Sequence, residues 1–418
     1  MQDITIWYSK ESTVLADWFI ANTNLSGWQG GLVVKKELFA SDAVAPKDFH
    51  RLPARIKDIL YLDSPDLIFS FMDIPFASLE ISEEAGTGHN AFQRFGRVAA
   101  AIENGVTAFY IYPEAAWISR QNVIPRWDQL NPMIFQALED AMHIHQIPAL
   151  LYYFPTDFTV NGSAAPLPTS SPKGHRYDSN PLYPKCPDPS DIWMKELFFG
   201  FNSMLGALLT FPVSDVGRNA LTQRWAVNHK KWMAHTKFKR MGTKAKWSPM
   251  SATIEIDTKI LLNHLAQFSG PVKNFGDLIT TRDRTVIYFA KEKYRTAGDP
   301  YTGAIAGIDY IACRTGRSYE QRDKNLVMAF GEVTIDSDKL NITGPASVSD
   351  YVDGVRDVYK RKGAVLLGES YSGLIGKIPR YMMQVRHGTT FTKRKDLRMF
   401  AYFCDAIIFP DGSLWREA

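Results

Sequence analysis

Short apolar runs alternate with segments of helical spacing over residues 1–154, and no other feature constrains the fold as strongly. The apolar runs have the length of ordinary strands and are bounded by proline, glycine or polar residues. The segments between them place apolar side chains on one helical face, which indicates amphipathic helices. We therefore predict strands at Asp3–Tyr8, Leu67–Phe71, Phe76–Ile81, Thr107–Tyr112 and Pro148–Tyr153, and helices at Ser12–Asn22, Pro46–Leu60, Gly88–Gly105 and Asn131–His145.

Such an alternation with short connections is typical of an α/β layer built on a mixed sheet. Pro155–Ser190 interrupts it, because its eight prolines exclude a helix or a central strand and indicate a linker or a long surface loop. Beyond it we expect an apolar helix at Asp191–Thr210 and a second mixed region. Its strand candidates are Thr285–Ala290, Ile305–Cys313, Leu326–Ile335, Ala364–Leu367 and Ala401–Phe409.

Length and composition indicate a globular protein of two or three domains, since the chain has 418 residues and 45% of them are hydrophobic. We expect an α/β domain over residues 1–154, a proline-rich linker or loop over 155–190, and a basic α+β domain over 191–418. The three cysteines, Cys186, Cys313 and Cys404, include no C-x-x-C pair, so structural zinc and a disulfide framework are not expected. We predict a cytoplasmic protein with no signal peptide and no membrane contact.

Charge is distributed unevenly along the chain. Residues 1–160 contain 11 Lys+Arg and 19 Asp+Glu, a net of −8, so the remaining residues carry 37 basic and 25 acidic side chains, a net of +12. The segment Val216–Ile254 contains no acidic residue at all. Its cations alternate with Trp225, Trp232 and Trp247, a mixture that suits a phosphate backbone and stacked bases. We predict nucleic-acid contact by this segment, with Lys230, Lys231, Lys237, Lys239 and Arg240 as candidate binding residues.

Two carboxylates stand at related positions on neighbouring predicted strands. Asp66 follows Pro65 at the head of one strand, and Glu80 lies near the end of the next. If the two strands pair as a hairpin, both carboxylates lie side by side on the sheet edge. They repel each other unless a cation lies between them, and a hard divalent ion such as Mg²⁺ or Mn²⁺ suits oxygen ligands. In a hydrolase that ion would activate a water and neutralise charge on a scissile phosphate.

This order of elements resembles the catalytic core of the PD-(D/E)XK nuclease superfamily, the fold of many restriction endonucleases. Pro65-Asp66 matches the Pro-Asp that opens one strand, and Glu80-Ile81-Ser82 stands where Glu-x-Lys lies on the next. The predicted helix and strand that follow complete the core, so the resemblance covers residues 64–112. It implies a restriction-endonuclease-like mixed sheet, Asp66 and Glu80 as catalytic ligands of Mg²⁺ or Mn²⁺, and hydrolysis of phosphodiester bonds in double-stranded DNA, as in restriction or phage defence.

One position departs from the superfamily pattern, because Ser82 stands in place of the lysine. Members of the superfamily vary here or recruit an equivalent side chain from elsewhere. The Ser82 hydroxyl can hold a water, Glu84 can bind a second ion, and Gln93 on the following helix can reach the site. Ser82 and Gln93 are therefore candidate catalytic residues, and the choice among Ser82, Glu84 and Gln93 stays open.

Two arginines on the helix after Glu84 are candidate phosphate ligands. Asn90, Arg94 and Arg97 recur at helical spacing on a different face from the apolar stripe, and Gly86-Thr87-Gly88-His89 precedes them. Arginines and a helix N-terminus beside two carboxylates suit a phosphate brought to a metal. The alternative is that Arg94 and Arg97 pair with Glu83, Glu84 or other acids in a surface network.

Other readings of the sequence stay open. Asp309 and Glu332, on either side of a cation-rich stretch, form a second acidic pair that could be an additional or the true site. The alternative to a metal-dependent endonuclease is a non-catalytic nucleic-acid-binding protein with a degenerate nuclease fold. Cleavage of both DNA strands usually requires two active sites, which leaves a homodimer open.

Overall fold

The computed structural model describes about half of the chain in two compact units, Met1–Ala245 and Lys246–Ala418. The described residues are 3–38, 52–60, 64–71, 73–83, 94–119, 124–130, 134–135, 138, 141–142, 145, 147–158, 168–210, 251–267, 282–290, 324–329, 332–343, 406–408, 410 and 414–415.

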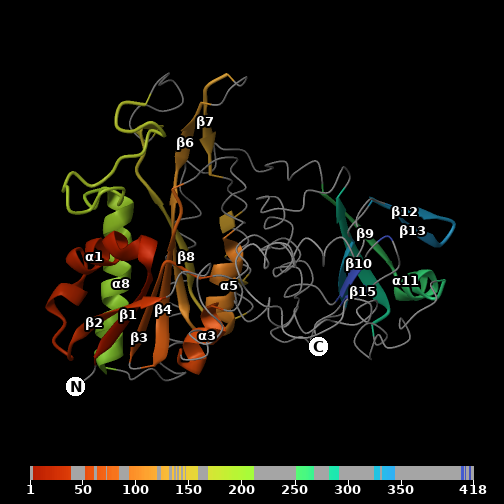
Figure 1. Ribbon diagram of the computed structural model, residues 1–418, viewed down its shortest axis with the longest axis horizontal. Helices are drawn as coiled ribbons and strands as arrows, with labels where there is room; N and C mark the ends of the chain where they lie inside the picture. The colour runs from red at the N-terminus through yellow and green to blue at the C-terminus, as the bar shows by residue number, and fades with distance from the viewer. Residues whose placement is uncertain are drawn as a thin grey trace, which may run out of the picture. The chain divides into compact units, whose positions relative to one another are not determined.

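The first unit is built on a six-stranded mixed sheet with the order β2-β1-β3-β4-β5-β8 (Figure 1). β3 runs antiparallel to both of its neighbours, whereas β4, β5 and β8 are parallel to one another, as are β1 and β2. The strands are β1 (Ile4–Ser9), β2 (Val33–Leu38), β3 (Leu67–Phe71), β4 (Ile74–Ile81), β5 (Thr107–Pro113) and β8 (Ala149–Phe154). Two short 3-10 helices, η1 (Lys10–Ser12) and η2 (Asn24–Gly27), flank the first α-helix.

The helices α1 (Thr13–Ala21) and α8 (Ile192–Thr210) lie on one face of this sheet (Figure 1). Aromatic rings fill the contact. Phe19 of α1 and Phe201 of α8 meet Phe69 of β3 at centroid distances of 5.3 and 4.9 Å, and Phe201 lies 5.8 Å from Phe109 of β5. All four side chains are buried, so this layer forms the apolar core that holds α8 to the sheet.

The helices α3 (Ala54–Leu60) and α5 (Phe95–Glu103) cover the opposite face, against β4 and β5. α5 buries Phe95, Val98, Ala99 and Ile102, which are the i, i+3, i+4 and i+7 positions of one helical face. Its small side chains let the helix backbone approach the sheet closely. The candidate carboxylates lie under this helix.

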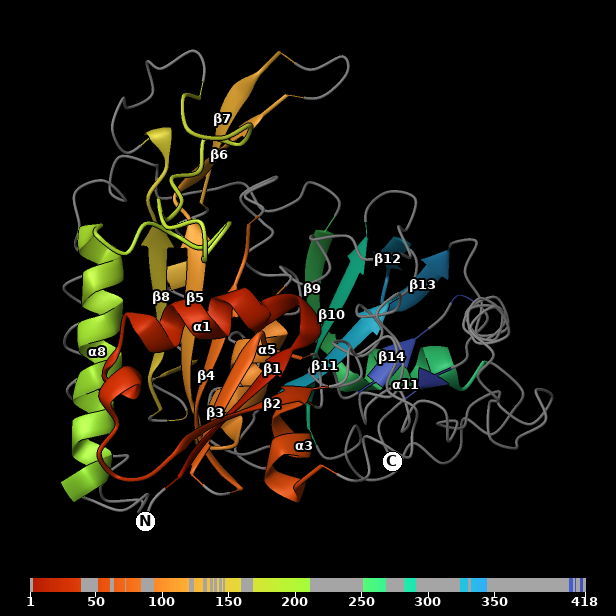
Figure 2. The same cartoon turned by 60° about the vertical axis from the view of Figure 1, so that its left-hand side comes forward.

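A two-stranded hairpin, separate from the β3–β4 hairpin of the sheet, begins directly after β5. It consists of β6 (Ala115–Ile118) and β7 (Arg126–Gln129), and both views show it clear of the six-stranded sheet, beyond the ends of β5 and β8 (Figures 1 and 2). The Trp117 and Trp127 rings meet across it at 5.5 Å. Gly174, with φ +75°, lies against Trp127, where an added Cβ would come 2.2 Å from the ring. Glycine is therefore required there.

Asp157 anchors the described part of the proline-rich segment to the first unit. Its carboxylate accepts hydrogen bonds from the Thr169 amide at 2.5 Å, the Ser170 amide at 2.9 Å and the Ser170 hydroxyl at 2.7 Å. Burial acts to raise the pKa of Asp157, but these hydrogen bonds outweigh burial and lower it. The Trp117 amide also donates to the Lys173 carbonyl at 2.9 Å, which joins this segment to the β6–β7 hairpin.

The second unit contains a five-stranded sheet with the order β15-β14-β11-β10-β9. Its core includes Ile256, Leu261, Ile287, Val327 and Ile408, which are all buried. The elements are β9 (Ser251–Asp257), α11 (Thr258–Leu265), β10 (Arg284–Ala290), β11 (Lys324–Ala329), the hairpin β12 (Glu332–Asp336) and β13 (Lys339–Thr343), β14 (Ala406–Ile408) and β15 (Leu414–Trp415).

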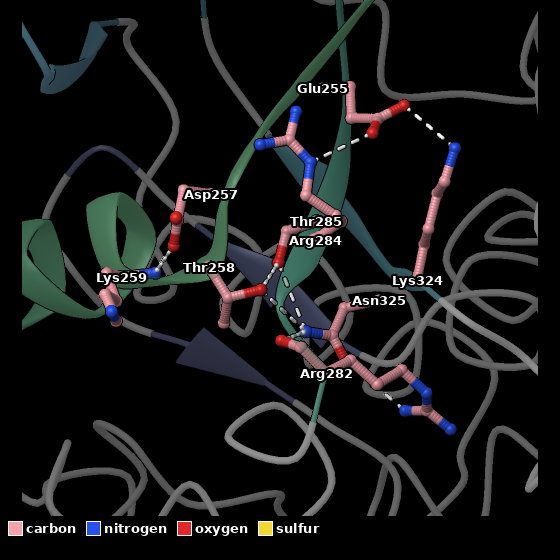
Figure 3. Close-up of polar contacts among 9 residues, drawn as sticks. All are labelled: Glu255, Asp257, Thr258, Lys259, Arg282, Arg284, Thr285, Lys324 and Asn325. Atoms are coloured by element: carbon pink, nitrogen blue, oxygen red, sulfur yellow. Dashed lines mark hydrogen bonds and ion pairs between the residues drawn. The ribbon is translucent and has the colours of Figure 1, made fainter.

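A buried polar cluster ties the starts of α11, β10 and β11 together (Figure 3). The Asn325 amide donates to the hydroxyls of Thr285 at 3.2 Å and Thr258 at 3.3 Å, and it accepts from Arg282 at 3.3 Å. Asn325, Thr285 and Thr258 are all buried. At the surface nearby, Glu255 accepts from the side chains of Arg284 and Lys324.

The α/β class and the mixed N-terminal sheet are confirmed, and all five strands predicted there form. β2 was not expected, because three consecutive charged residues, Lys35, Lys36 and Glu37, interrupt its apolar residues, and it lies at the sheet edge. The single strand expected at Leu326–Ile335 is wrong: β11 ends at Ala329 and β12 begins at Glu332, with Gly331 between them. Ile305–Cys313, Ala364–Leu367 and residues 84–93 lie outside the described residues.

The division into two units at residue 245 differs from the boundaries that we expected at residues 154 and 190. The reason is that α8 packs against β8 and the aromatic core of the first sheet. The helix predicted from residue 191 therefore belongs with the N-terminal sheet. The described part of the proline-rich segment, residues 168–190, contains turns and isolated bridges, as expected for a loop.

Candidate functional site

Asp66 and Glu80 meet across the antiparallel hairpin of β3 and β4. The register pairs Leu67 with Leu79, and one step further Asp66 stands opposite Glu80. The Ile81 amide donates a 2.8 Å hydrogen bond to Oδ2 of Asp66, which fixes the carboxylate beside the end of β4. The expected hairpin juxtaposition is therefore present. The expected location at the sheet edge is wrong, because β1 and β5 flank the hairpin on either side.

Neutral donors hold the Asp66 carboxylate. The Ser12 hydroxyl, at the end of η1, donates to Oδ1 at 2.7 Å and itself lies 2.7 Å from the Ser9 hydroxyl. Burial, followed by the charge of Glu80, raises the pKa of Asp66 to about 7. Near neutral pH this carboxyl group is therefore close to half protonated. A cation placed near it would stabilise its charged form.

Glu80 is compensated by two arginines. Its side chain is 2% exposed, and its Oε1 accepts from Nη1 of Arg94 and from Nη1 of Arg97, each at 2.5 Å. In the described part of the chain no group hydrogen-bonds to the other oxygen, Oε2. Glu80 thus combines two charge-assisted hydrogen bonds on one oxygen with unused acceptor capacity on the other.

The start of α5 places both guanidinium groups. Arg94 immediately precedes the helix and Arg97 lies three residues later, so their side chains project from the same side of the first turn. Both contact Glu80, which agrees with the alternative that they pair with acids, and Glu84 lies outside the described residues. The Arg94 side chain is 30% exposed and that of Arg97 is 11% exposed, so Arg94 is the more accessible of the two.

Tyr110 lies next to Glu80 in the sheet and was not predicted. The β4–β5 register pairs the two residues, and the Tyr110 ring is buried 5.6 Å from that of Tyr112. Burial raises the pKa of Tyr110 well above its ordinary value, so the phenol stays protonated. The alternation of Tyr110 and Tyr112 with apolar residues in 107–112 is the signal that could have found it.

Ser82 is buried at the end of β4. Its amide donates to the Ile111 carbonyl at 2.9 Å, and its side chain is 1% exposed. Strand alternation places Ser82 on the same side of the sheet as Glu80. Glu84 and Gln93, the other two groups considered for the role of the missing lysine, lie outside the described residues, so the choice among the three stays open.

The residues present fit a Mg²⁺ or Mn²⁺ ion with few protein ligands. No group of three or more His, Cys, Asp or Glu side chains that could hold a metal occurs within the described ranges. Mg²⁺ is nevertheless often held by one or two carboxylates together with waters and substrate phosphates. Oε2 of Glu80 has free acceptor capacity and Asp66 is destabilised as an anion, so these two carboxylates would hold the ion.

The remaining predicted site residues are not brought together by the described part of the chain. Glu332 begins β12 as an exposed side chain, and its expected partner Asp309 lies outside the described residues. The candidate DNA-binding cations Lys230, Lys231, Lys237, Lys239 and Arg240 also lie outside them. Their roles stay predictions.

Comparison of the chain with protein-family models, with curated proteins and with solved structures gives no match. Within the part of the chain that the structure describes, no helix combines the length and the apolar character needed to cross a bilayer.

Proposed function

We propose that this protein is a metal-dependent DNA endonuclease that hydrolyses phosphodiester bonds, of the restriction or phage-defence kind. One observation carries the proposal: Asp66 and Glu80 lie opposite each other on a hairpin in the middle of a mixed α/β sheet, and their proximity helps to raise the pKa of Asp66 to about 7. Perturbed carboxyl pairs of this kind concentrate at functional sites. The sequence resemblance to PD-(D/E)XK nucleases supports the same reaction.

The protein groups in this proposal have separate tasks. Ser12 and the Ile81 amide orient Asp66, while Arg97, the less exposed arginine, keeps Glu80 in place. Arg94 is accessible enough to exchange its contact with Glu80 for a substrate phosphate oxygen. A bound Mg²⁺ would supply an activated water and neutralise charge on the phosphate. The buried Tyr110 phenol, beside Glu80, excludes solvent from this side of the site.

The decisive experiment compares Asp66→Ala and Glu80→Gln with the wild type on plasmid DNA in Mg²⁺, Mn²⁺, Ca²⁺ and EDTA. We expect discrete products from the wild type in Mg²⁺ or Mn²⁺, and a loss of cleavage in both variants. DNA binding in Ca²⁺ should stay within a few fold of the wild type. Asp17→Asn serves as a control, because it removes an exposed carboxylate on α1, outside the site. Wild-type cleavage rates in Asp66→Ala would overturn the assignment and make Asp309 and Glu332 the pair to test.

Variants of Ser82, Glu84 and Gln93 test which side chain takes the role of the lysine that the superfamily pattern has at position 82. If Gln93 or Glu84 takes over its role, Ser82→Ala should cost little, and Gln93→Ala should slow single-turnover cleavage by one to two orders of magnitude, about 1.4–2.8 kcal/mol of transition-state stabilisation. Full activity in both the Gln93 and Glu84 variants would contradict a relocated role.

A second candidate function is nucleic-acid binding without catalysis. It is favoured by Ser82 in place of the lysine and by the two arginines, which already compensate Glu80 without a metal. Absence of cleavage by the wild type in both Mg²⁺ and Mn²⁺, with DNA binding retained, would decide for this function.

A further inference from the structure

The β6–β7 hairpin continues the strand that passes the candidate site. Glu80 pairs with Tyr110 of β5, and β6 begins shortly after it at Ala115. At about 3.3 Å per residue, the chain spans at most roughly 16 Å from Tyr110, the partner of Glu80, to the start of the hairpin, and the hairpin extends about 10 Å further. Figures 1 and 2 both show it standing away from the sheet.

The two faces of the hairpin differ. The register pairs Trp117 with Trp127 and, one step towards the tip, Ile118 with Arg126, so these pairs lie on opposite faces. The tryptophan face is covered, because Trp127 lies against Gly174 and 5.8 Å from Phe158. On the other face Arg126 is exposed, and its side chain makes no hydrogen bond or ion pair with the described part of the chain. Asp128, which pairs with the buried Ala116, shares the face of Arg126, so one face of the hairpin is anchored through its tryptophans and the other carries Arg126 and Asp128.

The hairpin and the segment packed on it carry more cations than acids among their described residues. Residues 1–160 have a net charge of −8. The described residues of the hairpin and of the segment packed on it, 115–119, 124–130 and 168–177, contain three cations and one acid: Arg126, Lys173 and Arg176 against Asp128. Lys173 is exposed beside Trp117, and Ile124 near the tip is 86% exposed. Arg126, Lys173 and Arg176 thus give the hairpin and the segment packed on it a small excess of positive charge, which favours a polyanionic partner.

We propose that the β6–β7 hairpin, with Lys173 and Arg176 beside it, is a docking arm for duplex DNA. The inference rests on the proposed nuclease function and adds a second contact surface to it. A two-stranded ribbon fits the major groove of B-DNA, about 12 Å wide, and the cations meet the flanking phosphates. The arm holds the duplex while a phosphate lies at Asp66 and Glu80.

The test measures binding of the full-length protein to a fluorescently labelled DNA duplex in EDTA, as a function of salt. The double variant Arg126→Ala with Lys173→Ala should weaken binding at least fivefold and flatten the slope of log K against log salt by up to about two units, at about 0.9 per lost phosphate contact. Arg126→Lys keeps the charge and should stay within twofold of the wild type. Lys195→Ala, an exposed cation on α8, is the matched control and should change nothing.

Thermal unfolding of each variant shows that the exposed substitutions leave the fold intact. An unchanged affinity and an unchanged salt slope in the double variant would overturn the proposal that the hairpin is a docking arm. A binding-competent protein that never cleaves would overturn the nuclease proposal alone, since the arm is scored on binding in EDTA. Cleavage by the wild type, together with unaltered DNA binding by the double variant, would overturn the docking-arm proposal and leave the nuclease proposal in place. Failure of the wild type to bind duplex DNA would overturn both.

Discussion

Asp66 and Glu80 carry the same charge, but the protein compensates them in different ways. Asp66 accepts from a hydroxyl and a backbone amide, which are neutral donors, whereas Glu80 accepts from two guanidinium groups. Asp66 therefore remains the carboxylate whose ionisation costs the folded state free energy. Binding of a proton or of a cation at Asp66 should therefore change the stability of the folded protein.

The first prediction concerns the pH dependence of stability. The pKa of Asp66 rises from 3.8 to about 7 on folding, so the folded state holds a proton that the unfolded state releases. The stabilisation of the folded state by this proton is fully present below about pH 4 and is lost as the pH rises through about 7. Asp66→Asn should therefore gain stability over the wild type between these pH values, by on the order of 2 kcal/mol. Chemical denaturation at pH 4.5, 6 and 8 measures this, and an equal difference at all three values would contradict it.

A divalent cation should replace the proton at Asp66. Mn²⁺ or Mg²⁺ at 100 times its dissociation constant should stabilise the wild type at pH 8 by about 2.7 kcal/mol. The stabilisation should disappear in Asp66→Asn and in Glu80→Gln. Asp157→Asn, which removes a carboxylate elsewhere in the same unit, should keep it. Thermal unfolding with and without the ion checks this, and an equal effect in all four proteins would place the ion elsewhere.

The two arginines should contribute unequally to stability. Arg97 is the more buried partner of Glu80, so Arg97→Ala leaves a buried carboxylate with one partner in a poorly solvated place. We expect a loss of about 3 kcal/mol. Arg94→Ala should cost clearly less, because its side chain is 30% exposed and water can replace it. Denaturant unfolding of the two matched variants measures the difference, and the opposite order would show that Arg94 is the structural partner.

At the level of elements, the Asp157 carboxylate is one of the contacts that hold the described proline-rich segment in place. Asp157 accepts from the amides of Thr169 and Ser170, and its lowered pKa shows that the folded state favours the charged form. Its contribution is present above about pH 4 and is lost as pH falls through the lowered value.

Asp157→Asn should therefore destabilise the protein at pH 7 by about 1–2 kcal/mol, which is the opposite sign to Asp66→Asn. Faster hydrogen exchange of the Thr169 and Ser170 amides should accompany the loss. Exchange that stays slow at both amides would mean that the Asp157 carboxylate does not hold this segment.

The elements differ in how well the sequence predicts them. β3, β4 and β5 follow from apolar runs bounded by proline or glycine, and the hairpin between β3 and β4 follows from their short connection. The contact of Ser12 with Asp66 joins residues 54 positions apart, and no local pattern encodes it. The pairing of both arginines with Glu80 depends in the same way on where α5 docks. Long-range contacts of this kind are decided by tertiary packing.

At the level of the whole molecule, charge separates along the sequence. The acidic part, residues 1–160, contains the carboxylate pair, and the remainder is basic. If residues 216–254 bind DNA, neutralising Lys230, Lys231, Lys237 and Lys239 together should flatten the slope of log K against log salt by up to about four units. Fluorescence anisotropy at several salt concentrations measures it. An unchanged slope would mean that these side chains do not contact the phosphates.

The position of the β3–β4 hairpin in the chain has a consequence for the order of assembly. Asp66 and Glu80 are close in the sequence, and a hairpin closes within microseconds, long before a ribosome adds another residue. Arg94 and Arg97 are added only after Glu80, and β5 and β8 follow later still. In the sequence, the hairpin that holds the two like charges is thus complete before the segment that supplies the arginine partners of Glu80 begins. Docking of α5 on the hairpin therefore brings in the two guanidinium groups that compensate Glu80, so this step, and not closure of the hairpin, completes the site.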